Sequence, residues 1–234
     1  MQVISSKNSR IWFDESLLMA EPENCFEPDY WQRNDAIIGQ ASGRGTTYFI
    51  QGKLLQMALR HYWRGGFFGR LVKDQYFFTG WDKTRSICEM RLLKLLSDGG
   101  VRVPRPVAAR AVRNGFLYRS DILTEKVPNA KDLVAIMQQR RLTDSEWYTI
   151  GQLIRKMHDL WVCHTDLNIH NILLDDLGQC WLIDFDKCYQ SKKEDWKQKN
   201  LDRLLRSLRK EVKRFSILWN ESDWDRLVKG YMQG

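Results

Sequence analysis

Two polar segments in the second half of the chain carry side chains suited to phosphate chemistry. They read CHTDLNIHNILL (residues 163–174) and WLIDFD (residues 181–186). Asn171 and Asp184 offer the hard oxygen ligands that Mg²⁺ prefers, with water and phosphate oxygens completing its shell. Asp166 is then left to accept a proton from an attacking hydroxyl. The set predicts phosphoryl transfer, which needs a metal, a base and little covalent help from protein.

A strand–turn–strand hairpin is expected to bring these side chains together. Its turn is predicted at residues 175–178, Asp-Asp-Leu-Gly, between two apolar runs. We expect His164 to hold the loop by hydrogen bonds. Apolar residues surround Asp184 in sequence, so we expect a buried carboxylate there, which would be costly without a cation or hydrogen-bond donors.

The first half is predicted to be a twisted sheet that carries one helix. Residues 36–52 and 54–63 have the composition of hairpin strands. Residues 84–100 place apolar side chains at helical spacing and end in two glycines. Residues 103–127 return to strands around an Asn-Gly turn. An irregular N-terminal arm is expected over residues 1–30.

The second half is predicted to be mainly helical. Thr143 and Glu146 stand in the register of a capping box, ahead of a helical apolar pattern. After the hairpin, an apolar helical stripe is expected to pack in the core: Leu201, Leu204, Leu205, Leu208, Val212 and Phe215. The prediction is therefore an α+β chain with an arm (1–30), a lobe of sheet and one helix (31–127), a mainly helical lobe (128–234) and a cleft between the lobes.

Composition sets limits on class and partner. With 234 residues, 43% of them hydrophobic, a sizeable core is available. Five scattered cysteines without a CxxC pair argue against a disulfide framework or zinc knuckle and fit a reducing compartment. No secretory signal or apolar run of about 20 residues is apparent. The net charge of +8 is concentrated in residues 36–73 and 187–214, which favours an anionic partner.

The pattern His-x-Asp-Leu-x-x-x-x-Asn-Ile-Leu-Leu, followed by Ile-Asp-Phe, resembles the catalytic and metal-binding loops of the protein-kinase-like superfamily. The resemblance implies a two-lobed fold, with an N-terminal antiparallel sheet and helix and a mainly helical C-terminal lobe. It implies ATP and Mg²⁺ as cofactors. It also implies that Asp166 is the catalytic base and that Asn171 and Asp184 are the metal ligands.

The same resemblance places the nucleotide in the first half. Gly43 and Gly45, at a hairpin tip, would let backbone N–H groups approach the phosphates. Glu125 and Val127 lie where the hinge of this superfamily offers backbone groups to adenine.

A phosphate-binding cation is also implied. Arg60 stands where the third strand of kinases usually carries lysine, and Glu89 is its expected ion-pair partner. Arginine can clamp phosphate through two N–H groups, although with a different geometry. Two lysines remain alternatives for this cation: Lys53 and Lys73.

Several departures from protein kinases narrow the acceptor. Thr165 replaces the arginine that reads a phosphorylated activation loop, and Asp186 replaces the glycine after Asp-Phe. Asn168 stands where protein kinases usually carry a phosphate-contacting lysine. No Ala-Pro-Glu follows, which leaves little scaffold for a protein substrate. These departures favour a small or lipid-linked hydroxyl acceptor.

Five segments are similar to the bacterial 3-deoxy-D-manno-octulosonic acid (Kdo) kinases of the lipopolysaccharide kinase family: GRGTTYF, LRHYWRGGFFGRL, VRVPRPVAA, HTDLNIHNILL and WLIDFDKC. The resemblance covers roughly residues 30–220. It implies ATP-dependent phosphorylation of the 4-hydroxyl of Kdo on a lipid A precursor. It also implies a peripheral protein on the cytoplasmic face of the bacterial inner membrane, an anionic surface. We hypothesise that Arg64 and Arg70 contact the acceptor headgroup or the membrane; a tight turn with its two phenylalanines in the core is the alternative.

Other functions stay open at this point. An atypical protein Ser/Thr kinase or another small-molecule kinase of the superfamily would share the same loops. A module that only binds nucleic acid or lipid would explain the charge but not Asp166, Asn171 and Asp184. We expect no nucleic-acid partner and infer no obligate protein partner.

Overall fold

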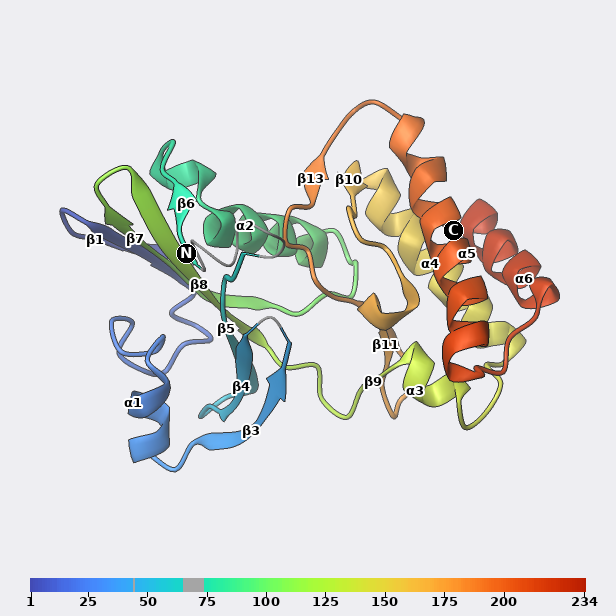
Figure 1. Cartoon of the computed structure of the whole chain (residues 1–234), viewed down its shortest axis with the longest axis horizontal. Helices are drawn as coiled ribbons and strands as arrows, with labels where there is room; N and C mark the ends of the chain where they lie inside the picture. The colour runs from blue at the N-terminus through green and yellow to red at the C-terminus, as the bar shows by residue number, and fades with distance from the viewer. Residues whose placement is uncertain (44, 65–73) are drawn as a thin grey trace. The chain divides into compact units, whose positions relative to one another are not determined.

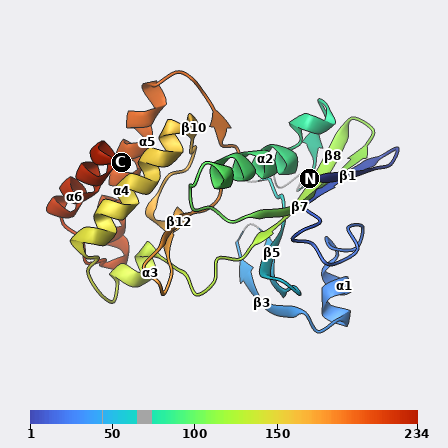
Figure 2. The ribbon, with the colours of Figure 1, turned by 180° about the vertical axis from the view of Figure 1, so that it is seen from behind.

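The computed structural model describes residues 1–43, 45–64 and 74–234, shown from opposite sides in Figures 1 and 2. The chain forms two compact units. The sheet unit comprises Met1–Lys94 and Arg105–Lys126, and the helical unit comprises Leu95–Pro104 and Val127–Gly234. Two basic residues named above lie outside the described residues: Arg70 and Lys73.

An antiparallel sheet organises the sheet unit, in the order β1-β2-β7-β8-β5-β4-β3, with β6 also paired to β8. Its strands are β1 (Gln2–Ser5), β2 (Ser9–Phe13), β3 (Ile37–Ser42), β4 (Thr46–Gln51), β5 (Gln56–His61), β6 (Tyr76–Phe77), β7 (Pro106–Asn114) and β8 (Leu117–Glu125). The predicted hairpins are confirmed, as is the turn at Gly115, where a φ of 60° suits glycine.

The two faces of the sheet are covered differently because neighbouring residues of a strand point to opposite sides. Helix α2 (Arg85–Asp98), which confirms the predicted helix, bonds to Arg60 of β5. On the other face, Leu59 belongs to a buried cluster that includes Phe26 and Trp31 of the N-terminal segment. Helix α1 (Pro28–Arg33) lies in that segment.

The expectation of an irregular N-terminal arm is wrong for its first residues. Strands β1 and β2 form a hairpin, and β2 continues the sheet by pairing with β7, with Trp12 opposite Ala109. Each run is only four or five residues long. A single short hairpin is marginal in water, so its pairing with a strand about a hundred residues away decides its structure, and local sequence does not report that pairing.

The helical unit contains helices with two small sheets. Its helices are α3 (Leu133–Met137), α4 (Asp144–Asp159), α5 (Asp195–Phe215) and α6 (Glu221–Gln233). Its strands are β9 (Lys131–Asp132), β10 (Val162–Cys163), β11 (Ile172–Leu174), β12 (Cys180–Leu182) and β13 (Tyr189–Gln190). The predicted capping box opens α4, where Thr143 accepts from the Glu146 amide and Glu146 accepts from the Thr143 amide. The predicted α+β class is confirmed.

Helices α4 and α6 lie side by side in both views (Figures 1 and 2), and glycines let them approach closely. A Cβ on Gly151 would stand 2.0 Å from the Leu227 carbonyl oxygen, and one on Gly230 would stand 2.1 Å from the Tyr148 carbonyl oxygen. Backbone therefore packs against backbone at this contact. In the described part of the chain, no helix combines the length and the apolar character that crossing a membrane requires.

Candidate functional site

The loop after β10 is held by a buried histidine. His164 Nδ1 accepts from the Asp166 amide at 3.2 Å, and its Nε2 donates to the Ile183 carbonyl at 3.0 Å. Burial lowers the pKa of the imidazole, so the neutral form with its proton on Nε2 fits both bonds. The ring also packs on Phe185, with centroids 4.8 Å apart. The prediction that His164 holds the loop by hydrogen bonds is confirmed.

Asp166 presents its carboxylate at the surface of the helical unit, with about half of the side chain exposed. Its backbone carbonyl accepts from the side-chain amides of Asn168 and Asn171, each at 2.9 Å. Its Oδ1 accepts two bonds from Arg203 of α5, from Nε at 3.0 Å and Nη2 at 2.7 Å. The backbone and one carboxylate oxygen of Asp166 are therefore both fixed.

The β11–β12 hairpin brings Asn171 and the segment before Asp184 together. Ile172 pairs with Leu182, and the Ile183 amide donates to the Asn171 carbonyl at 3.0 Å. Since the Asn171 amide nitrogen is bonded to Asp166, its Oδ1 is turned away from that bond and can serve as a ligand.

The expectation that Asp184 is buried is wrong. Its side chain is exposed, while that of Phe185 is buried. Asp184 has a φ of 63°, a left-handed conformation that turns the chain so that the aromatic ring enters the core and the carboxylate faces solvent. Asp186, which replaces the usual glycine, does not adopt a positive φ; the positive φ values fall at Asp184 and Lys187.

The two oxygen donors fit a magnesium ion whose other ligands are water and phosphate oxygens. Asn171 and Asp184 provide one amide and one carboxylate oxygen, as Mg²⁺ bound to nucleotide phosphates requires. Among the described residues, no group of three or more His, Cys, Asp or Glu side chains could hold a metal by itself. Water and phosphate oxygens would therefore supply the other ligands.

Helix α5 holds this loop at further points that the sequence analysis missed. Asn200 accepts from the His164 amide at 3.1 Å, and Ser207 accepts from the Ile169 amide at 3.2 Å. Together with Arg203, these residues are spaced three and four apart, on one face of the helix. That polar spacing, beside the apolar stripe, was the signal available in the sequence. The stripe itself is buried at Leu201, Leu204 and Leu208, whereas Phe215 at its end is exposed.

The sheet unit contains the expected ion pair between β5 and α2. Arg60 Nη2 lies 2.5 Å from Glu89 Oε1, and Glu89 is only 5% exposed. The Tyr62 hydroxyl donates to the other oxygen, Oε2, at 2.5 Å. The Arg60 guanidinium lies over the Tyr62 ring, 5.1 Å from its centroid. Sequence reasoning missed Tyr62. Lys53, an alternative cation, is exposed in the loop between β4 and β5.

The glycine-rich turn connects β3 to β4. The Gly43 amide donates to the Gly45 carbonyl at 2.9 Å. A Cβ on Gly45 would stand 2.0 Å from Trp63 Nε1, whereas one on Gly43 would meet nothing nearer than 4.0 Å. Gly45 is therefore required by close packing against an indole ring, and Gly43 has open space around it.

At the end of β8, Glu125 and Val127 differ in how they are held. The Glu125 amide donates to the Arg105 carbonyl at 2.8 Å. Its carboxylate accepts from the Arg105 amide, Nε and Nη2, at 3.2, 2.9 and 3.0 Å. Because the Arg105 amide donates to this side chain, it does not donate to the Glu125 carbonyl. Val127 is buried and begins the helical unit.

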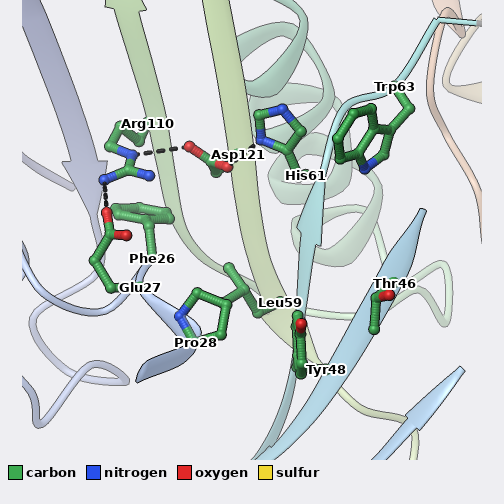
Figure 3. A pocket seen from close by; sticks show the side chains of 10 residues that line it. All are labelled: Phe26, Glu27, Pro28, Thr46, Tyr48, Leu59, His61, Trp63, Arg110 and Asp121. Atoms are coloured by element: carbon green, nitrogen blue, oxygen red, sulfur yellow. Dashed lines mark hydrogen bonds and ion pairs between the residues drawn. The ribbon is translucent and has the colours of Figure 1, made fainter. Parts of the chain in front are cut away.

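A cavity of about 360 Å³ lies on the face of the sheet that Leu59 and His61 share, away from Arg60 (Figure 3). Its wall contains a chain of charges: Arg110 bonds to both Glu27 and Asp121, and Asp121 accepts from His61 at 2.6 Å. This chain ties the N-terminal segment to strands β5, β7 and β8.

The acceptor or membrane hypothesis for Arg64 and Arg70 stays a prediction. The Arg64 guanidinium lies over the Tyr76 ring, 5.1 Å from its centroid, and its Nε is buried. Arg70 and both phenylalanines of the segment lie outside the described residues.

Comparison with known proteins decides the family. The sequence pattern of the Lipopolysaccharide kinase (Kdo/WaaP) family matches residues 28–231. The chain belongs to this family. A Photobacterium profundum relative named 3-deoxy-D-manno-octulosonic acid kinase is 55% identical over 99% of this chain and 98% of its own. Relatives with the same name are 54% identical in Vibrio cholerae, over 94% of each chain, and 45% identical in Haemophilus influenzae, over the whole of both. The predicted resemblance is confirmed.

Among solved structures, the Cydia pomonella granulovirus kinase PK-1 is a weak match, with a TM-score of 0.46 and 14% identity over 67% of this chain and 53% of that one.

Proposed function

We propose that this Kdo/WaaP family member transfers the γ-phosphoryl group of ATP to the 4-hydroxyl of Kdo on a lipid A precursor. The observation that carries the proposal is that the loop holding Asp166 and Asn171 occurs in a chain whose relatives are named Kdo kinase. Asp166 and Asn171 are hydrogen-bonded in a loop that also meets the Asp184 segment. Relatives named Kdo kinase match nearly the whole chain at 45–55% identity.

In the proposed mechanism, Asp166 is the general base. It accepts the proton of the acceptor hydroxyl, whose oxygen then forms a bond to the γ-phosphorus. The bond from that phosphorus to the bridging oxygen breaks, and its electron pair leaves with ADP. Asn171 and Asp184 would hold Mg²⁺, which neutralises charge on the phosphates.

The sheet unit would bind the nucleotide. Arg60, paired with Glu89, would contact phosphate oxygens, because the planar guanidinium binds phosphate through its N–H groups. Gly43 and Gly45 would present backbone N–H groups to the phosphates. The Glu125 carbonyl and the Val127 amide would contact adenine. This is supported by the Arg105 amide, which donates to the Glu125 side chain and not to the Glu125 carbonyl.

The test incubates the purified chain with γ-labelled ATP and four acceptors: the Kdo-bearing lipid A precursor, the same lipid without Kdo, free Kdo, and a protein substrate such as casein. We expect label only on the Kdo-bearing lipid, at its 4-hydroxyl by NMR. Asp166→Asn should lower turnover by about 10²–10⁴-fold, as for loss of a general base. Asp176→Asn, an exposed acid in the neighbouring turn, is the matched control.

Label on protein alone would replace this proposal with the protein-kinase alternative. Equal activity of Asp166→Asn and the parent chain would remove the assigned base.

We also infer that the chain works as a peripheral protein on the anionic cytoplasmic face of the inner membrane, where its acceptor lies. Exposed basic residues without an ion-pair partner among the described residues support this: Lys187, Lys192, Lys193, Arg206, Lys213 and Arg214. Each could contribute about 1 kcal/mol at an anionic surface. Sedimentation with phosphatidylglycerol vesicles should show binding that salt weakens, with phosphatidylcholine vesicles as control. Equal binding to both would contradict the inference.

The Arg64 and Arg70 hypothesis has its own test. Replacing both by alanine should raise the acceptor KM or weaken vesicle binding. If neither value changes, these arginines do not contact the acceptor or membrane.

A further inference from the structure

Helix α5 contributes a cation to the catalytic loop from 37 residues away. The Arg203 guanidinium binds Asp166 through Nε and Nη2, and both bonds fall on Oδ1. In the described part of the chain, Asp166 Oδ2 accepts no hydrogen bond. This geometry keeps one oxygen of the carboxylate in place and leaves the other for a proton.

The loop itself carries no cation beside its base. Two residues after Asp166 stands Asn168, whose side chain is turned inward: Nδ2 donates to the Asp166 carbonyl and Oδ1 accepts from the His170 amide. Asn168 therefore supports the loop backbone and brings no charge. Of the residues described around the loop, Arg203 is the one with a guanidinium bonded to the Asp166 carboxylate.

The packing of α5 fixes the backbone position from which the Arg203 side chain extends. Leu201 and Leu204 on either side of it are buried, and the helix bonds to the loop one turn before and one turn after, at Asn200 and Ser207. Roughly half of the Arg203 side chain stays exposed, so its remaining N–H groups face solvent beside the carboxylate.

We propose that Arg203 is the positioning residue of the active site, which orients Asp166 for proton transfer and supplies the positive charge that the loop lacks. This rests on the proposed function. During transfer, negative charge spreads over the phosphoryl oxygens next to the base, and a preorganised cation there stabilises the transition state more than the ground state. The effect should therefore fall on kcat and leave the ATP KM nearly unchanged.

The test compares Arg203→Met with Arg209→Met. Arg209 lies on the same helix and forms the same kind of two-bond ion pair, but with Glu221 of α6. Arg203→Met should lower kcat by about 10²-fold, within the range for losing one electrostatic donor. Arg209→Met should stay within about threefold, a change of under 1 kcal/mol. Arg203→Lys should retain an intermediate rate because it keeps the charge but not the fork.

Two additional measurements separate positioning from a structural role. Guanidinium ions at non-denaturing millimolar concentration should restore part of the Arg203→Met rate, because they can occupy the vacated site. The melting temperature and ATP binding of Arg203→Met should match those of the parent chain, which checks that the variant folds.

An Arg203→Met rate within threefold of the parent would overturn the proposal, as would a loss that guanidinium does not reverse. Failure of the proposed function would look different: Asp166→Asn would then be as active as the parent, or the Kdo-bearing lipid would remain unlabelled.

Discussion

Replacing Gly151 by alanine should separate α4 from α6. The added Cβ would stand 2.0 Å from the Leu227 carbonyl oxygen, whereas ordinary contact begins at 3.4 Å, so the helices must move apart by roughly 1.4 Å along that line. Overpacking typically costs 1–3 kcal/mol, and a backbone neighbour favours the upper end. The higher helix propensity of alanine compared with glycine offsets this cost by about 1 kcal/mol. The free energy of unfolding should fall by about 2 kcal/mol, which lowers Tm by roughly 4–8 °C.

Gly230→Ala tests the same contact from the other helix and should cost a similar amount. Because one separation of the helices relieves both clashes, the double variant should lose clearly less than the sum of the single losses. Calorimetry gives the three values. Gly39→Ala is the control, since its Cβ would make an ordinary 3.5 Å contact with Phe49. Additive losses, or a stabilised Gly151→Ala, would refute the backbone-against-backbone packing.

Three other outcomes are expected. Gly45→Ala should raise the ATP KM about tenfold and Gly43→Ala much less, because only the first clashes with Trp63; equal effects would remove the steric argument. Burial lowers the pKa of His158 to about 4. Below pH 6.5 the imidazole therefore binds a proton in the unfolded state, whereas in the native state it stays mainly neutral down to about pH 4. The unfolding free energy should therefore fall by about 3 kcal/mol from pH 7 to pH 4, and His158→Gln should flatten that dependence in denaturant titrations. Excess EDTA should stop phosphoryl transfer and added Mg²⁺ restore it; transfer that survives EDTA would exclude the proposed ion.

Elements with strong local signals were predictable. The capping box at Thr143 and the Asn-Gly turn at Gly115 are encoded within a few residues, and both are present. The pairing of β2 with β7 is not encoded locally, because the stability of a short strand comes from its partner. The exposure of Asp184 was missed for a similar reason. Apolar neighbours in sequence indicate burial only if the backbone stays extended, and a φ of 63° breaks that alternation.

In the candidate site, the ion pair of Arg60 with Glu89 followed from motif positions, but Tyr62 did not. Tyr62 lies two residues after Arg60 and so leaves the strand on the same side, where its hydroxyl reaches the second oxygen of Glu89. A buried carboxylate needs hydrogen-bond partners for both oxygens. A hydroxyl near the expected pair could therefore have been predicted, although the motif does not include one.

The placement of Arg203 on α5 has a physical consequence for this fold. A lysine within the loop would depend on the loop backbone for its position, and a flexible side chain would pay entropy to reach the base. An arginine on a helix anchored by Leu201 and Leu204 has a fixed origin, and its planar fork loses less freedom for each bond formed. The same helix also bonds to the loop backbone at Asn200 and Ser207. Base, loop and cation therefore share one rigid support, so any change that loosens the packing of α5 should misalign Asp166 even where no loop residue is touched.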